Sequence, residues 1–262
     1  MIKILFIGDI VAKVGRRMVQ ELLPDLVKKH QIDFVIANGE NATHGKGIIY
    51  NHYQQLKQAG VDAITLGNHY DDRDEIRTFL DAATDIIRPI NLLNDYPGVG
   101  SALFDNGRIR IRVTNVLGSA FLLEKVENPF IAFDRLLTTI EPGDIHIVDF
   151  HAEATAEKRS FGYAFDGRVS AIIGTHTHVQ TRDAKILPAG SAYISDVGMT
   201  GAEESVLGVI PDITIRRFWH GENKFFDYDD KAAGLLSAVV ITIDENTNLA
   251  TKITPLYILE HE

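Results

Sequence analysis

The sequence contains no cysteine, which excludes disulfide bonds and thiolate metal sites. Any metal that the chain binds must therefore be held by nitrogen and oxygen ligands. Positive charge is also scarce, because 26 lysines and arginines face 36 aspartates and glutamates and the formal net charge is −10. Passive capture of nucleic acid by a broad basic surface is thus not expected, whereas a local basic cleft stays compatible with this balance.

Long apolar runs are missing as well. No run approaches the roughly 18 apolar residues that a membrane-spanning helix needs. The apolar N-terminal stretch resembles a signal peptide only briefly, because Asp9 interrupts it and no small-residue cleavage site follows. We therefore expect a cytoplasmic protein with no membrane partner.

The chain has no Pro/Ser-rich linker, no repeat and no low-complexity tract. Its 262 residues, of which 45% are hydrophobic, can bury a sizeable core and fit one large domain or two small ones. We expect a single domain over residues 1–262.

The first half alternates between two kinds of hydrophobic pattern. Apolar, β-branched runs predict buried strands, and leucines at helical spacing predict the first of the helices between them. This alternation indicates βαβ units and a mainly parallel sheet. The predicted strands are residues 2–7, 34–37 and 63–66, and the predicted helices are residues 18–30, 53–60 and 74–80.

The second half is richer in strand patterns. Residues 109–116 alternate with period two, as a half-buried strand does. The whole pattern favours an α/β fold with two packed sheets. The predicted strands here are residues 109–116, 145–150, 169–173, 193–195, 213–215, 235–243 and 250–256, with a hairpin turn at 244–248.

Residues that bind metals or transfer protons stand at or just after the ends of five predicted strands. In Ile-Ile-Gly-Thr-His-Thr-His-Val, His176 and His178 follow a β-branched run, and on an extended segment their side chains would lie on one side. Open α/β sheets bind ligands beyond the carboxyl ends of their strands, where these residues are expected to meet. The full set is Asp9, Glu40, Asn41, Asn68, His69, His151, His176 and His178.

Each candidate also has an ordinary structural explanation. Asp9 can be a turn residue or a helix cap, and residues 40–41 can be a solvated loop pair. Asn68 suits a turn, His69 suits a surface position, and a lone histidine such as His151 is more often structural than a ligand. We favour a metal-dependent hydrolase because the ordinary explanation requires five independent coincidences at five strand ends.

Taken in order, the motifs resemble those of the calcineurin-like metallophosphoesterases, and more narrowly those of the bacterial YmdB-like cyclic nucleotide phosphodiesterases. The wider superfamily usually has Asp-x-His as its first motif and an aspartate as the bridging acid. Here Ile10-Val11 follow Asp9, so the histidine of that motif is missing, and the bridging acid would be Glu40. Both differences are those of the YmdB-like branch. The family usually has a tryptophan after Gly-Asn-His, whereas Tyr70-Asp71-Asp72 stands here, so the local lid or base-stacking surface is expected to differ. The other matching segments are residues 67–69, 88–89, 149–155, 174–178 and 195–201.

The resemblance implies two mixed β-sheets flanked by α-helices, with the site at their carboxyl-end rim. It implies a binuclear centre bridged by Glu40, with His69 as the proton donor to the leaving oxygen. The implied metals are iron, with manganese able to substitute, and the implied substrates are small nucleotides of the 2′,3′-cyclic class. The implied ligands of the first metal are Asp9, Asn41 and His178, and those of the second are Asn68, His151 and His176.

Two metals about 3.5–4 Å apart would share a water, lower its pKa and so provide hydroxide at neutral pH. Two other functions stay open at this point. One is a phosphomonoesterase or nucleotidase with the same metals, and the other is a regulatory, metal-dependent role in RNA or protein binding. A homo-oligomer is compatible with the sequence, which does not fix its order.

Overall fold

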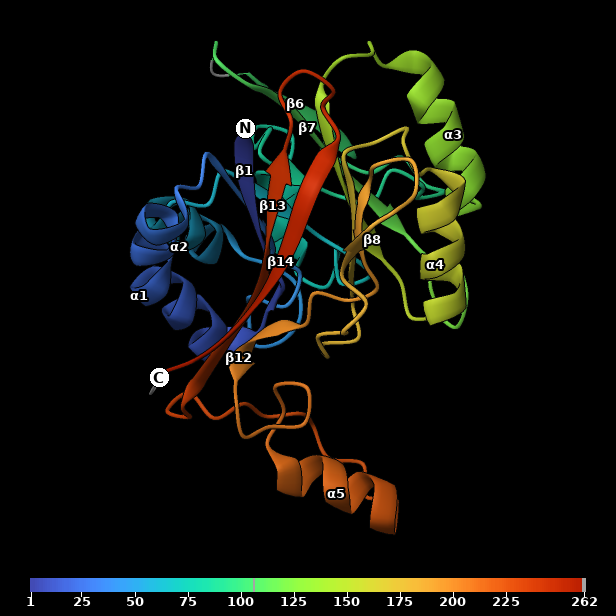
Figure 1. The fold of residues 1–262 in the computed structure, drawn as a ribbon. Coiled ribbons are helices and arrows are strands. Elements are labelled where there is room, and N and C mark those ends of the chain that lie inside the picture. The colour runs from blue at the N-terminus through green and yellow to red at the C-terminus, as the bar shows by residue number, and fades with distance from the viewer. Residues whose placement is uncertain (106, 261–262) are drawn as a thin grey trace.

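The computed structural model describes residues 1–105 and 107–260, in which two β-sheets pack face to face and helices cover their outer faces (Figure 1). The helices are α1 (Ala12–His30), α2 (Tyr50–Ala59), the 3-10 helix η1 (Asp74–Thr78), α3 (Pro129–Thr139), α4 (Thr155–Ala164) and α5 (Pro211–His220). Helices α1 and α2 lie on one side of the pair of sheets, and α3 and α4 lie on the other (Figure 1). Helix α5 projects beyond both sheets (Figure 1).

The first sheet has eight strands, β1 (Ile2–Ile7), β2 (Asp9–Ile10), β3 (Phe34–Asn38), β4 (Ala63–Thr65), β5 (Ile86–Ile87), β12 (Met199–Ala202), β13 (Gly234–Ile243) and β14 (Ala250–Leu259). Their order is β2-β12-β13-β1-β3-β4-β5, with β14 paired to β13. Strands β1, β3, β4 and β5 run parallel, and β13 runs antiparallel to β1. The predicted hairpin turn joins β13 to β14.

The second sheet has six strands, β6 (Ser101–Asp105), β7 (Arg110–Leu117), β8 (Ile145–His151), β9 (Ala171–Thr175), β10 (Lys185–Ile186) and β11 (Ala192–Ile194). Their order is β10-β11-β9-β8-β7-β6, with parallel pairing from β11 to β7 and antiparallel strands at both edges. The predicted α/β fold with two mixed sheets flanked by helices is confirmed. The single-domain interpretation stays a prediction.

The core has three apolar layers, because successive side chains of a strand face opposite sides of its sheet. In β1, Phe6 faces the second sheet and shares a cluster with Ile147, whereas Leu5 faces the helices and shares one with Met18. A third cluster joins the second sheet to α3 and α4 around Phe161. Burial on both faces explains why the central strands read as continuous apolar runs rather than as alternating patterns.

The predicted start of the first helix at residue 18 is wrong, since α1 begins at Ala12. The glycine and the arginines before Met18 broke the apolar pattern, yet this first part of the helix is largely buried. A Cβ atom at Gly15 would lie 2.3 Å from the carbonyl oxygen of Thr200, so the glycine lets the helix approach β12.

Two other predicted elements are also corrected. Residues 74–80 do not form an α-helix, because only Asp74–Thr78 are helical and they form a 3-10 turn anchored by Ile76. Residues 213–215 are not a strand but part of α5. Pro211 at the first position favours this helix start, and Gly221 with a φ of 68° ends the helix, so these residues outweigh the β-branched Ile-Thr-Ile run between them.

Helices α3 and α4 have no counterpart among the predicted elements. The α3 start is nevertheless well specified locally, because Pro129 occupies its first turn and the Asn128 side chain accepts hydrogen bonds from two backbone N–H groups. Among the described residues, no helix is both long and apolar enough to cross a membrane.

Candidate metal centre

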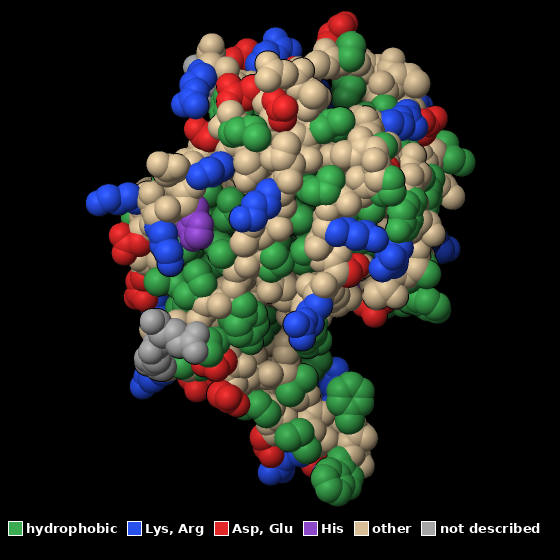
Figure 2. Space-filling model, in the orientation of Figure 1, with side chains coloured by type: hydrophobic (Ala, Val, Ile, Leu, Met, Phe, Trp, Pro, Cys, Tyr) green, Lys and Arg blue, Asp and Glu red, His purple; other side chains and the backbone are tan. Residues whose placement is uncertain are grey.

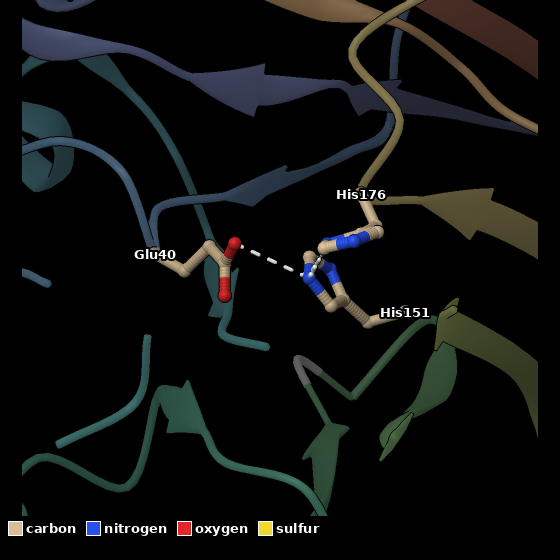
Figure 3. A group of neighbouring side chains, drawn as sticks. All are labelled: Glu40, His151 and His176. Carbon is tan, nitrogen blue, oxygen red and sulfur yellow. Dashed lines mark hydrogen bonds and ion pairs between the residues drawn. The ribbon is translucent and has the colours of Figure 1, made fainter. Parts of the chain in front are cut away.

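The candidate residues meet where strands of both sheets end. Glu40 follows β3, His151 is the last residue of β8, and His176 follows β9. Their side chains point toward one another from these three elements (Figure 3). Because each sheet contributes, the site lies at the junction of the two sheets rather than on one of them.

One group of ligand-type atoms surrounds Nε2 of His151. This nitrogen lies 2.9 Å from Oδ1 of Asn68, 3.1 Å from Nδ1 of His176 and 3.2 Å from Oε1 of Glu40. Ligand atoms that share one ion at a distance of about 2.1 Å are themselves on the order of 3 Å apart. The group therefore has the spacing of a coordination shell.

A second group of ligand-type atoms also contacts Oε1 of Glu40. Nδ2 of Asn41 is 3.1 Å from Oε1 of Glu40 and 3.2 Å from Nε2 of His178. Oδ1 of Asp9 is 3.9 Å from the same His178 nitrogen. A half-turn of the Asn41 side-chain amide would place its oxygen, instead of its nitrogen, toward Glu40 and His178. Glu40 thus stands between two sets of nitrogen and oxygen donors.

The two histidines of the His-x-His pair belong to different groups. His176 faces His151 and His178 faces Asn41, and the assignment of each residue to a metal stays a prediction. The expected extended segment is wrong, because His176 has a φ of 103° and His178 a φ of 65°. These left-handed conformations turn the two rings toward separate points.

Buried polar contacts hold this strained segment in place. The carboxylate of Asp196 accepts a hydrogen bond from the backbone N–H of Thr177 at 2.9 Å and pairs with Lys158 at 2.7 Å. The Lys158 ammonium also donates to the carbonyl oxygen of Thr175 at 2.7 Å. Since the Lys158 and Asp196 side chains are almost fully buried, both ends of the ion pair are fixed by packing as well as by charge.

His151 is oriented from behind by a chain of hydrogen bonds. Its Nδ1 lies 2.9 Å from the hydroxyl of Thr175, which donates to Oδ1 of Asp149 at 2.6 Å. The other Asp149 oxygen accepts from Thr65 and Asn38 at 2.5 and 3.0 Å. This arrangement directs Nε2 of His151 toward Glu40.

His178 is oriented in a similar way by a backbone group. The Nδ1–H of His178 donates to the carbonyl oxygen of Leu207 at 3.2 Å, which leaves Nε2 of the neutral ring with its lone pair toward Asn41. Leu207 belongs to the segment between β12 and β13, here called the 203–233 segment, and its φ is 55°.

His69 lies at the edge of the centre. Its backbone N–H donates to Oε2 of Glu40 at 2.9 Å, and its Nδ1 lies 2.8 Å from a carboxylate oxygen of Asp72. The side chain lines the cavity above the two groups. It is therefore the candidate residue best placed to meet a substrate rather than a metal.

The electrostatics of the centre follow from burial and from the crowding of acids. Burial raises the pKa of Asp9 well above its ordinary value, and the neighbouring carboxylate of Glu40 adds to the rise. Burial also opposes protonation of His151, but Glu40 and Asp9 outweigh it and raise its pKa to about 9. Burial lowers the pKa of His176 to about 3, so this ring is neutral, the form that binds a metal.

Three features fit metal ions at this place. Oδ1 of Asp9 is buried and has no hydrogen-bond partner among the described residues, although an unpartnered carboxylate oxygen is costly. A Cβ atom at Gly67 would lie 2.3 Å from Oε2 of Glu40 and 2.5 Å from the His151 ring, so the backbone closes tightly around the donors. The donors are imidazole, carboxylate and amide groups, which suit iron and manganese.

A cavity of about 400 Å³ opens over the centre. The metal-site side chains form one wall, and the 203–233 segment forms the opposite wall with mainly apolar groups. The residues of this opposite wall are Val206, Leu207, Val209, Thr214, Phe218, Phe226 and Tyr228.

Sequence reasoning missed the residues that position the ligands. Thr175 and Glu153 lie inside motifs already recognised, and a polar side chain one or two residues from a motif histidine was the available signal. Lys158 sits on an unpredicted helix, and the Leu207 contact involves a backbone carbonyl that any residue type supplies. The apolar wall was missed because part of α5 was read as a strand.

Comparisons with known proteins agree over nearly the whole chain. The model of the YmdB-like protein family matches residues 5–256. A Bacillus subtilis protein named 2′,3′-cyclic-nucleotide 2′-phosphodiesterase is 44% identical over 258 residues, which cover 98% of this chain and 97% of that protein.

Two solved structures share the fold. The crystal structure of a novel phosphatase from Mycoplasma pneumoniae has a TM-score of 0.93 and 42% identity, covering 98% of this chain and 93% of that one. A hypothetical protein from Thermus thermophilus has a TM-score of 0.92 and 37% identity, covering 99% of this chain and all of that one. The predicted family is thereby confirmed, and the chain belongs to the YmdB-like protein family.

Proposed function

We propose that this protein is a metal-dependent phosphodiesterase that hydrolyses nucleoside 2′,3′-cyclic phosphates. The observation that carries the proposal is the position of Glu40 between two groups of nitrogen and oxygen donors at the floor of one cavity. The name of the Bacillus subtilis relative supports both the enzyme class and this substrate.

Two ions would be held by the residues that meet at Glu40. Asp9, Asn41 and His178 would bind the first ion, Asn68, His151 and His176 would bind the second, and Glu40 would bridge them. When bound, such ions activate water and neutralise charge on a phosphoryl group. The imidazole, carboxylate and amide donors suit iron and manganese, the two metals that the family resemblance implies.

His69 would supply the proton that the reaction requires. Hydrolysis adds the oxygen of water to phosphorus and breaks the bond from phosphorus to O2′, which leaves a nucleoside 3′-phosphate. The departing O2′ must take a proton, and His69 faces the cavity where this oxygen would lie. Asp72 beside Nδ1 would orient the ring so that Nε2 is directed to the cavity.

The test is metal analysis of the freshly purified protein, followed by rate measurements on a panel of phosphate esters. The panel contains 2′,3′-cyclic AMP, 3′,5′-cyclic AMP, bis-p-nitrophenyl phosphate and 5′-AMP. We expect two metal ions per chain and the highest kcat/KM for 2′,3′-cyclic AMP, with 3′-AMP as the product. In Glu40→Gln, where the bridging carboxylate is lost, both the metal content and the rate should fall.

Two outcomes would overturn the proposal. Faster turnover of 5′-AMP than of any cyclic nucleotide would identify a phosphomonoesterase, in line with the phosphatase named in the Mycoplasma pneumoniae structure. Protein that retains its metals and turns over none of these esters would point to a binding role without catalysis.

A further inference from the structure

We propose that the preferred substrate is an RNA chain that ends in a 2′,3′-cyclic phosphate, and that a groove beside the metal centre binds the nucleotide preceding that end. The inference rests on the proposed function, because the terminal cyclic phosphate would occupy the cavity over Glu40. It extends that function from free nucleotides to the ends of RNA chains.

The groove is a second cavity of about 420 Å³ that adjoins the first. The two cavities share three lining residues, Lys46, Phe226 and Tyr228. A ligand held over Glu40 can therefore continue past these side chains into the groove. A mononucleotide fills one such space, whereas a chain of nucleotides fills both.

The lining of the groove carries cations and aromatic rings without any carboxylate. His44, Lys46, Arg217 and Lys224 supply the basic groups. Among residues 1–105 and 107–260, Lys46 and Arg217 form no salt bridge, whereas Lys224 pairs with Glu222 at 3.2 Å. In a chain with a net charge of −10, this local basic surface is complementary to the negative charge of a phosphodiester.

Aromatic side chains provide flat surfaces for bases. Phe225 is 98% exposed and Phe226 lies beside it under the guanidinium of Arg217, at 4.4 Å from the ring centroid. Aromatic residues next to a cationic groove are the usual means of binding single-stranded nucleic acid, because every base can stack on them. Figure 2 shows apolar side chains gathered on the projecting region around α5.

The groove is held in shape by contacts with the metal-site loop. Arg73 donates to the carbonyl oxygens of Lys46 and Thr43 at 2.9 and 3.0 Å, which fixes the loop that carries Lys46. A Cβ atom at Gly45 would lie 1.9 Å from the hydroxyl oxygen of Tyr228, so the 203–233 segment packs directly on this loop. Arg217 is itself held by hydrogen bonds to Asn223 and to the Lys224 carbonyl oxygen at 3.2 and 2.9 Å.

Chemistry selects RNA as the occupant. A 2′,3′-cyclic phosphate requires a ribose with both hydroxyls, so a chain attached to such an end is RNA. The terminal nucleotide connects to its predecessor through its 5′ oxygen, which places a phosphodiester and a base one step away from the cyclic phosphate. In the groove, a cationic group would bind this phosphodiester and an aromatic surface would stack on this base.

The experiment compares hydrolysis of 2′,3′-cyclic AMP with that of ApA and a tetra-adenylate that each end in a 2′,3′-cyclic phosphate. We expect the dinucleotide to have a KM at least about 10-fold lower than the mononucleotide, the order that stacking of one base provides, with a similar kcat. Binding of a fluorescein-labelled tetranucleotide, followed by anisotropy, should weaken as salt concentration rises.

Variants of the groove separate the two cavities. Phe225→Ala, Lys224→Ala and their combination change residues that line only the groove. We expect them to raise the KM of the dinucleotide toward that of the mononucleotide and to leave mononucleotide turnover unchanged. Trp219→Ala is the matched control, because this ring is 78% exposed on the same segment and lines neither cavity.

The results distinguish this inference from the proposed function. Failure of every cyclic phosphate to react would overturn the proposed function. Equal kcat/KM for mononucleotide and oligonucleotides, or equal losses for both in the groove variants, would overturn the inference alone. A dimer that dissociates in Lys224→Ala/Phe225→Ala would instead identify the groove as an interface between two copies.

Discussion

The Oε2 atom of Glu153 lies 3.1 Å from Nε2 of His176, while Nδ1 of the same ring lies 3.1 Å from Nε2 of His151. His176 thus turns one nitrogen to the candidate metal centre and the other to a half-exposed carboxylate at the rim. A carboxylate at the outer nitrogen of a metal-binding histidine fixes its tautomer and makes it a better ligand. Glu153 is therefore a positioning residue in this structure.

Removal of this carboxylate should weaken metal binding. We expect Glu153→Ala to lower the affinity for Mn²⁺ by about 10- to 100-fold, measured by isothermal titration calorimetry on metal-free protein. Glu153→Gln keeps an acceptor oxygen without the charge. Its affinity for Mn²⁺ should lie between those of the unchanged protein and of Glu153→Ala. The control is Glu21→Ala, an exposed glutamate of α1. An unchanged affinity in Glu153→Ala would show that His176 needs no such partner.

The hydroxyl of Thr175 is the link between His151 and the buried Asp149. We expect Thr175→Val, which is close in shape, to lower the free energy of unfolding by about 1–3 kcal/mol because Asp149 loses a hydrogen-bond donor in the interior. Metal content should fall as well, since His151 loses the acceptor that orients it. Urea unfolding and metal analysis provide the two measurements.

Thr175→Ser separates the role of the hydroxyl from that of packing. This variant keeps the hydroxyl and removes only a methyl group, so it should retain the metals and most of the stability. If it loses as much metal as Thr175→Val does, the methyl group rather than the hydrogen-bond link is responsible.

The strand ends could be predicted from the sequence because burial and chemistry agree there. A continuous apolar run marks a central strand, and a polar residue at its end lies at the rim of the sheet whatever the loop does next. This pattern alone identifies Asp9, Glu40, Asn68, His151 and His176 as candidates. None of this required knowledge of loop conformation.

The conformation of the loops could not be predicted in the same way. The left-handed backbone at His176 and His178 depends on Asp196 and Lys158, which lie elsewhere in the chain. Helix α5 buries only Thr214, so almost no apolar periodicity toward a core was available to identify it. The wall opposite the metal centre therefore became visible only in the structure.

His69 should act on the leaving group and not on the metals. We expect His69→Ala to retain its metal content and to lose about 10²- to 10⁴-fold in kcat for 2′,3′-cyclic AMP, whose alkoxide leaving group needs a proton. The variant should keep most of its rate on bis-p-nitrophenyl phosphate, because p-nitrophenolate leaves without one. Equal losses on both substrates would contradict the role of proton donor, and His30→Ala provides the histidine control.

His146 gives the protein a predictable dependence of stability on pH. This histidine is buried at the start of β8, its Nε2 lies 2.8 Å from the hydroxyl of Thr114, and its ring lies 5.6 Å from that of Phe133. Burial and the nearby charge of Arg112 lower its pKa from 6.5 to about 3, although Asp144 acts in the opposite direction. The folded protein therefore holds this ring neutral under conditions in which the unfolded chain protonates it.

The sign of the effect follows from proton uptake. Between pH 6.5 and about 3 the unfolded chain binds a proton at His146 that the folded protein does not. The contribution of His146 to the free energy of unfolding is therefore complete above pH 6.5 and is lost as the pH falls. In this window His146 alone makes the free energy of unfolding change with pH by a slope that approaches about 1.4 kcal/mol per pH unit. We expect His146→Gln, which keeps a hydrogen-bonding amide without a titrating group, to flatten the curve of unfolding free energy against pH between about 4 and 6.5. Urea unfolding of both proteins across this window provides the measurement, and parallel curves would show that His146 titrates normally in the folded state.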